Sequence, residues 1–367
     1  MRMRATLPGL RERPVSVRWP GIDVHEAAPA WHAGRMSNTE REPAEVLCGV
    51  HGADGPGVTV LVPRDVPLGG PRAMNVRRTL PSRERTLIGA WCFADHYGPD
   101  PVAESGGMVV TPHPHTGLAT VSWLFTGEVE HRDSIGTVAM VRPGEVNLMT
   151  AGRGISHSEI STERTTVLHG VQLWLALPDA RRDMAPAFEH YAPEPVVGEG
   201  WSAAVFLGDL LGQPSPVSTQ TPVLGAELRV EAGTTLRLDV DASFEHGLLV
   251  DHGVVTFAGQ ELKPAELGYL APGCTTLEIT AHEDALLVLL GGPPFGEQLV
   301  MWWNFVGRSH EDVVASRDQW QAQITRDGEV VGDSQEVAPG RFGVVAGDHT
   351  PPIPAPPLPN LRLRPRG

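Results

Sequence analysis

Short β-favouring runs, each closed by a turn that contains glycine, proline or aspartate, dominate the chain from about Leu80 to Leu177. The clearest runs are residues 108–111, 120–125, 136–141 and 167–177, and the turns between strands read TGE, DSIG, RPGE and AGRG. A second series of the same kind runs from Leu224 to Leu290. Strands of this length and spacing are typical of a sandwich or barrel. The 41 glycines and 34 prolines among 367 residues likewise favour a turn-dense, all-β protein.

The charge balance narrows the range of partners. The chain has 29 Lys and Arg against 44 Asp and Glu, a net charge of −15, and no basic run interleaved with aromatic residues. Such a surface repels phosphate backbones, so we expect no direct nucleic-acid binding. No eighteen apolar residues run together, and Cys48, Cys92 and Cys274 form no CxxC pair. We therefore expect a soluble, cytoplasmic protein with no membrane span and no disulfide framework.

The two strand series predict the domain organisation. We expect a loose N-terminal extension over 1–57, a first barrel over 58–180, a linker over 181–222, a second barrel over 223–292 and a C-terminal segment over 293–367. In that last segment Ser309 can cap a helix with Asp312 three residues on, and Val313, Trp320 and Ile324 fall near one face. The Pro-rich tail is expected to pack on the barrels, and a polyproline ligand for another protein is the alternative.

The two series resemble each other weakly, which suggests an internal repeat. Gly127 after the first series' Trp-Leu-Phe-Thr matches Gly253 at an offset of 126, and Gly144 of the RPG turn matches Gly273 of APG at an offset of 129.

Two short patterns carry the chemistry: His113-Pro-His115 and His157-Ser-Glu159. Side chains alternate faces along a strand, so each pattern directs a pair of potential ligands to one side. The 42 residues between His115 and His157 suit strands that lead out and return inside a small barrel. The alternative is that both pairs are accidental surface residues on a half-exposed strand.

Three imidazoles and a carboxylate form a donor set that suits Fe(II) and also Ni, Mn, Co, Cu or Zn. An octahedral ion held by four protein ligands keeps two open positions, where a chelating substrate or a substrate and dioxygen can bind. Glu159 could also detach and act as a base.

Other histidines are expected to play ordinary roles. His131 and His169 are expected to be hydrogen-bonded or solvated, with donation to a metal ligand as the alternative, and His96 is expected in a turn.

The motifs around these residues resemble the pirin family. Residues 113–136 read HPHTGLATVSWLFTGEVEHRDSIG, residues 141–159 read VRPGEVNLMTAGRGISHSE, and FADHYGP and WNFVGRSHEDV follow the pattern of bacterial members. The resemblance implies two cupin-type β-barrels packed together (a bicupin) and one iron in the N-terminal barrel. Its ligands would be His113, His115, His157 and Glu159. One departure is Ala119, where the family often has Glu, and it puts the inherited substrate preference in doubt.

The second series is expected to form a barrel without metal. At the 126 offset, Asp239 and Asp241 replace the two histidines of HPH, and no HxE follows the Pro-Gly turn. His246 and His252 do not share a face in this register.

Two functions follow from the resemblance. The first is a quercetin 2,3-dioxygenase-like reaction, in which a flavonol or similar chelating phenol binds the iron, Glu159 assists deprotonation and O2 cleaves the ring. An apolar mouth formed by Trp123, Phe125, Met149 and Val171 would favour it, although these residues equally suit a barrel core. The alternative is a non-catalytic, iron-dependent, redox-responsive regulator that binds a protein partner.

Overall fold

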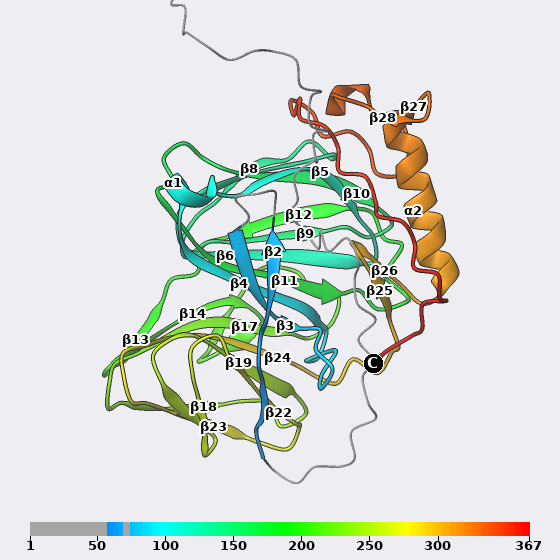
Figure 1. Cartoon of the computed structure of the whole chain (residues 1–367). Coiled ribbons are helices and arrows are strands. Elements are labelled where there is room, and N and C mark those ends of the chain that lie inside the picture. Colours follow the sequence, from blue (N-terminus) through cyan, green and yellow to red (C-terminus); the bar gives the residue numbers. More distant parts are fainter. Residues whose placement is uncertain (1–56, 69–73) are drawn as a thin grey trace, which may run out of the picture. The chain divides into compact units, whose positions relative to one another are not determined.

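The computed structural model describes residues 57–68 and 74–367, so the extension expected over 1–57 lies, up to residue 56, outside the described residues. Two β-barrels of the cupin type, each built from a seven-stranded and a four-stranded sheet, make up most of this part (Figure 1). The predicted all-β class is confirmed. Among the described residues, no helix combines the length and apolar character needed to span a bilayer.

The first barrel pairs its strands antiparallel throughout. Its seven-stranded sheet has the order β12 (Ala187–Tyr191), β9 (Val146–Thr150), β6 (Leu118–Thr126), β11 (Val167–Ala176), β4 (Trp91–Pro101), β3 (Met74–Leu80) and β2 (Arg64–Leu68). Its four-stranded sheet has the order β5 (Val109–His115), β10 (Ile155–Ser161), β7 (Val129–Asp133) and β8 (Val138–Val141). The short helix α1 (Val102–Ser105) follows β4.

The second barrel repeats this plan. Its seven-stranded sheet has the order β1 (Thr59–Leu61), β22 (Leu267–Leu270), β19 (Glu245–His252), β24 (Ala285–Gly292), β17 (Leu224–Val230), β14 (Trp201–Leu207) and β13 (Val196–Gly198). Its four-stranded sheet has the order β18 (Thr235–Asp239), β23 (Thr276–Ala281), β20 (Val255–Phe257) and β21 (Gln260–Leu262). The hairpin of β15 (Asp209–Leu210) and β16 (Gln213–Pro214) follows β14.

Strand pairing differs from the predicted boundaries in two places. Strand β1 was expected in the first barrel, but it pairs with β22 of the second. The segment expected to be a linker contains strands of both barrels, because β12 pairs with β9 while β13 and β14 join the second barrel. Edge strands of a barrel gain hydrogen bonds from any chain segment that reaches them, and local sequence does not identify that segment.

The internal repeat is real, but one of the two proposed alignments is wrong. The RPG turn joins β8 to β9, and its counterpart joins β21 to β22 at Lys263-Pro-Ala265, an offset of 121. Gly144 and Ala265 both have positive φ, +75° and +69°, at the same place in these turns. The APG sequence at 271–273 lies one connection later, between β22 and β23.

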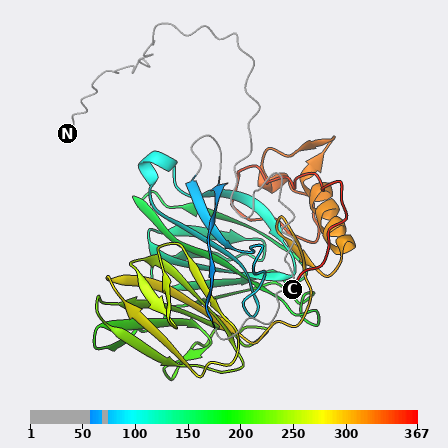
Figure 2. The same ribbon diagram turned by 60° about the horizontal axis from the view of Figure 1, so that its bottom comes forward.

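A shared apolar core joins the two barrels. It contains buried side chains from β4 and β6 of the first barrel and from β14, β19 and β24 of the second, among them Trp91, Trp123 and Phe206. The Trp123 indole Nε1 donates to Glu227 Oε2 of β17 at 2.7 Å, and its ring stacks on Phe206 at 4.7 Å. In Figure 2 the green and yellow strands of the second barrel lie beside the cyan strands of the first.

The C-terminal segment covers the four-stranded sheet of the first barrel. Hairpin β25 (Val300–Trp302) and β26 (Phe305–Gly307) leads into α2 (His310–Ile324), followed by hairpin β27 (Thr325–Arg326) and β28 (Glu329–Val330) and a 3₁₀ turn at Ser334–Glu336. The predicted cap is confirmed, since Ser309 and Asp312 form a capping box. Ile353 N donates to Pro112 O at 2.8 Å, and Ser156 Oγ donates to Phe342 O at 3.0 Å. The orange helix and red tail therefore run alongside β5 and β10 in Figure 1.

Candidate metal centre

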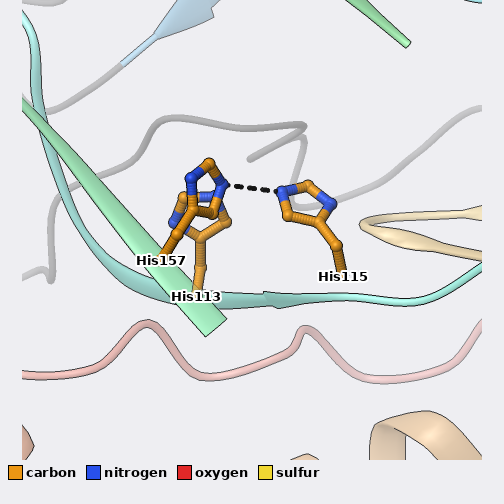
Figure 3. A group of neighbouring side chains, drawn as sticks. All are labelled: His113, His115 and His157. Carbon is orange, nitrogen blue, oxygen red and sulfur yellow. Dashed lines mark hydrogen bonds between the residues drawn. The ribbon is translucent and has the colours of Figure 1, made fainter. Parts of the chain in front are cut away.

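Three buried histidines meet inside the first barrel. His113 and His115 extend from β5, and His157 extends from β10 as the cross-strand partner of His113. Each has one ring nitrogen in a group of three whose members all lie within 4.8 Å of one another, and each is at most 1% exposed. His115 Nε2 and His157 Nε2 face each other at 3.0 Å, as Figure 3 shows. Strand alternation places these side chains, as the HxH spacing predicts.

Glu159 is displaced from the position that the HxE spacing predicts. Its carboxylate groups with His157 and His131, and it is not part of the group formed with His113 and His115. The pairing of β10 with β5 shifts register between His157 and Glu159, and such a bulge redirects the side chain that follows it. Ser122 Oγ donates to Glu159 Oε1 at 3.2 Å.

The hydrogen bonds around the cluster define consistent tautomers. His113 Nδ1 donates to Thr111 O at 2.9 Å, which leaves the lone pair of His113 on Nε2. His157 Nδ1 lies 3.4 Å from His131 Nδ1, and His131 Nε2 lies 3.3 Å from Asp133 Oδ2. If His131 donates to Asp133, its Nδ1 accepts from His157, whose lone pair then also lies on Nε2. A chain from carboxylate to imidazole to ligand imidazole is a common support for metal ligands.

His131 therefore contacts a ligand imidazole, a role that the sequence offered only as the alternative to an ordinary hydrogen-bonded or solvated histidine. It lies on β7, whose burial alternates so that His131 and Asp133 both point inward. That period-2 pattern was present in the sequence as Val129-Glu-His-Arg-Asp133, but alternation alone does not tell which face of an isolated strand is buried.

Burial keeps the three imidazoles of the cluster in their neutral, ligating form. Loss of hydration lowers the pKa of His113 to about 4, and a hydrogen bond to Thr111 only partly opposes this effect. Burial, followed by the neighbouring imidazoles, lowers the pKa of His115 and of His157 well below the ordinary value. Burial raises the pKa of Glu159, with the imidazole of His131 opposing it. Neutral imidazoles bind metal, whereas imidazolium ions do not.

The residues present fit a transition metal. The buried Nε2 of His113 has no hydrogen-bond partner within the described residues. The Nε2 atoms of His115 and His157 lie 3.0 Å apart. Two nitrogens bound at about 2.1 Å and at right angles would be about 3.0 Å apart. The three imidazoles are thus spaced as ligands of one ion, and Glu159 groups with one of them, His157.

An aromatic wall borders the cluster, but it differs from the predicted mouth. Trp174 meets the ring of His115 edge-on at 5.2 Å and stacks on Phe93 at 4.0 Å. The residues expected at the mouth mostly lie elsewhere. Trp123 and Val171 are buried in the core between the barrels, with Phe125 packed against it. Met149 forms a small cluster with Ala151 and Ile155.

Ala119, the departure from the family pattern, also lies in the core between the barrels. Its side chain therefore points away from the imidazoles, because Ser122 and the other even-numbered positions of β6 face inward. A small side chain at this position changes the contact between the barrels.

His96 and His169 occupy the boundary between the barrels. His96 was expected in a turn, but it lies in the middle of β4 and is buried. Both rings contact Asp251 Oδ1 of β19, at 2.6 Å from His96 Nε2 and 2.5 Å from His169 Nε2. The Arg77 guanidinium lies 3.1 Å from His96 Nε2 and already supplies a positive charge there. This group is best described as a polar contact that joins the barrels.

The second barrel has apolar side chains where the first has its imidazoles. Leu238 and Leu277 are cross-strand partners on β18 and β23 and are fully buried, as His113 and His157 are on β5 and β10. The proposed equivalence of Asp239 with His113 is therefore wrong by one residue, and Asp239 and Asp241 are exposed. A slip of one residue moves every side chain of a strand to the opposite face.

The fold and the site together define a class: two cupin barrels in one chain, the first with inward-facing histidines, make a bicupin. The chain belongs to the pirin family. Residues 73–175 match Pirin, and residues 225–325 match the Pirin C-terminal cupin domain.

Individual relatives agree with this assignment. A Pseudomonas aeruginosa protein named "Putative quercetin 2,3-dioxygenase" is 41% identical over 297 residues, which cover 81% of this chain and 89% of the relative. A crystal structure of quercetin 2,3-dioxygenase from Acinetobacter baumannii aligns with a TM-score of 0.75 at 36% identity, over 84% of this chain and 98% of that one. A bacterial pirin from Escherichia coli, solved in complex with nickel(II), shares the fold at 18% identity and a TM-score of 0.51, over 65% of this chain and 99% of that one.

Proposed function

We propose that this protein is a mononuclear metal oxygenase of the quercetin 2,3-dioxygenase type, with Fe(II) held by His113, His115, His157 and Glu159. The observation that carries the proposal is the convergence of three buried, neutral imidazoles at ligand spacing. The names of the relatives from P. aeruginosa and A. baumannii support the reaction type. The donor set also accommodates Ni, Mn, Co, Cu or Zn, and nickel is the first alternative to test because a pirin of the same fold was solved with it.

When bound, the metal would polarise the vicinal oxygens of a flavonol or similar chelating phenol and bring O2 beside it. The protein's residues would do the rest. Glu159, which lies beside His157 and accepts a hydrogen bond from Ser122, would take the proton of the substrate hydroxyl. The buried setting excludes water, and the ring of Trp174 provides an apolar wall next to His115.

Metal content tests the ligand assignment. Anaerobically purified protein loaded with Fe(II) should contain one iron per chain by elemental analysis, and His113→Ala should contain far less while keeping its circular dichroism spectrum. His349→Ala, which removes an exposed imidazole, is the matched control and should bind like the wild type. Stoichiometric iron in a His113→Ala, His157→Ala double variant would show that these residues are not the ligands.

Oxygen consumption tests the reaction. The iron-loaded wild type should consume O2 with quercetin and release a ring-cleaved product, identified by mass spectrometry, whereas Glu159→Gln should react far more slowly. Tight iron binding without any O2 uptake would contradict the oxygenase proposal and leave the metal centre intact.

A further inference from the structure

The second barrel has a cavity of about 650 Å³ at the end where the first barrel has its imidazoles. The cavity opens between the β15–β16 hairpin, the start of β17 and the connection from β18 to β19. Strands β18 and β19 are the counterparts of β5 and β6, and the end of β5 carries His113 and His115. A volume of this size is typical of small-molecule sites. The corresponding end of the second barrel is thus hollowed beside Val240, at the end of β18, and His246, at the start of β19.

His246 is a buried polar side chain that lines this cavity, and the ring of Phe244 lies 6.3 Å from its imidazole. It belongs to the inward face of β19 with Leu248 and Val250, is fully buried and lines the cavity. Neither of its ring nitrogens has a hydrogen-bond partner among the described residues. Gly291 lies opposite it on β24, where a Cβ atom would come within 3.2 Å of the imidazole Cδ2. A buried polar group without a hydrogen bond is unfavourable, and one in a cavity indicates a group that a ligand can satisfy.

The form of the imidazole limits what it can bind. Burial lowers the pKa of His246 to about 4, with the Asp241 carboxylate opposing the shift, so the ring is neutral at pH 7. A neutral imidazole offers one N–H donor and one acceptor nitrogen. A hydroxyl group, which donates and accepts, is a suitable partner for either nitrogen.

The rim of the cavity is acidic, and the rest of its lining is mostly apolar, with Ser215 and Thr219 as hydroxyl groups. The acidic groups are Asp209, Asp239 and Asp241, and no lysine or arginine is among the lining residues. Phe244 and Leu224 are among the apolar lining residues, and the ring of Phe244 lies 6.3 Å from that of His246. The combination repels anions and favours a cation with an apolar body.

We propose that this cavity binds a small aromatic amine with a ring hydroxyl, whose hydroxyl meets His246, whose ring packs on Phe244 and whose ammonium meets the acidic rim. Each part of the ligand is complementary to one feature of the cavity. The proposal does not depend on the metal centre or on the oxygenase reaction, because the cavity lies in the other barrel.

Three probes of nearly equal size separate these contributions. Tyramine carries both polar ends, phenethylamine lacks the hydroxyl, and 3-(4-hydroxyphenyl)propionate replaces the ammonium by a carboxylate. We expect saturable 1:1 binding of tyramine to the full-length protein by calorimetry. Phenethylamine should bind about tenfold more weakly, the effect of about one hydrogen bond, and the carboxylate should not bind. Equal binding of all three probes, or no binding of tyramine, would overturn the proposal.

Single substitutions test whether tyramine binds in this cavity. His246→Leu should weaken tyramine about tenfold and leave phenethylamine unchanged, and Asp241→Asn should weaken both amines. Asp318→Asn removes the same charge from an exposed position on α2 and is the matched control. His113→Ala should bind tyramine like the wild type. A loss in His113→Ala, or the same affinities in His246→Leu as in the wild type, would refute this location.

The variants also separate a binding role from a structural one. His246→Leu replaces an unpartnered imidazole by an apolar side chain among apolar neighbours, so its melting temperature without ligand should be at least that of the wild type. Binding that is abolished by salt and unchanged by all variants would instead show attraction to the net charge of −15, and would overturn the site.

Discussion

At the scale of single residues, the first barrel and the second use buried histidines differently. His113, His115 and His157 face one another. The Nδ1 atom of His157 contacts His131, which in turn contacts Asp133. His246 lies beside the ring of Phe244, and its ring nitrogens have no hydrogen-bond partner among the described residues. In each case the side chain is neutral because burial penalises the charged form.

Asp133→Asn should weaken metal binding about 10- to 100-fold, the usual effect of losing support behind a ligand. The amide oxygen can still accept from the backbone N–H groups of Ile135 and Thr137, so the turn survives. The amide NH2 group then replaces Oδ2, and it cannot accept a hydrogen bond from His131 Nε2. Competition with a chromophoric chelator measures the affinity. Glu130→Gln, on the same strand and half-exposed, is the control, and equal affinity in both variants would contradict the relay from Asp133 to His157.

Acid should destabilise the wild type more than His246→Leu. The unfolded chain protonates this imidazole near its ordinary pKa of 6.5, whereas the folded barrel does so only at about 4. Unfolding therefore takes up a proton within this window, and the free energy of unfolding falls as the pH falls from 6.5 towards 4. Urea unfolding at pH 7 and pH 5 should show a smaller loss in the variant. Equal losses would mean that His246 is already protonated in the folded barrel.

At the scale of elements, the position of each strand decides what its residues do. Strand β6 turns Ser122 towards Glu159 and Trp123 towards the other barrel, so one strand serves the metal centre and the contact between barrels. The C-terminal segment closes the outer side of β5 and β10, which explains why these strands are buried on both faces.

Trp123→Phe should lower the free energy of unfolding by about 2 kcal/mol more than Trp302→Phe does, since hydrogen bonds to charged groups are worth about 1.5 to 3 kcal/mol. Trp123 donates to the buried Glu227 carboxylate. The indole N–H of Trp302 is also buried but has no partner among the described residues, so its loss removes packing alone. Urea unfolding measures both. Equal destabilisation would show that the bond across the barrels contributes nothing.

At the scale of the whole molecule, the apolar core between the barrels couples their stability. Strand β1 joins the second barrel and continues into β2 of the first, so the described chain crosses between the barrels before β2 as well as after β12. The shared cluster contains side chains from both seven-stranded sheets.

Leu238→Ala, in the core of the second barrel, should therefore lower the temperature of metal release from the first barrel as well as the melting temperature. Removing a buried leucine costs about 2 to 5 kcal/mol. Near-ultraviolet circular dichroism and metal release, followed on heating, should report one common transition. Leu361→Ala, at a side chain that is 71% exposed, is the control. Two separate transitions would show that the barrels unfold independently.

The sequence by itself determined what depends on local order along the chain. Period-2 spacing placed His113 and His115 on one face of their strand, turn residues marked the strands, and Ser309 and Asp312 marked the helix. Tertiary structure decided what depends on pairing between distant segments. It places β1 in the second barrel and Leu238, rather than Asp239, at the position that corresponds to His113. It also buries His96 next to Asp251 and His131 next to His157. Alternation tells which residues share a face, but only the pairing of strands fixes which face is inside, because a slip of one residue exchanges the two.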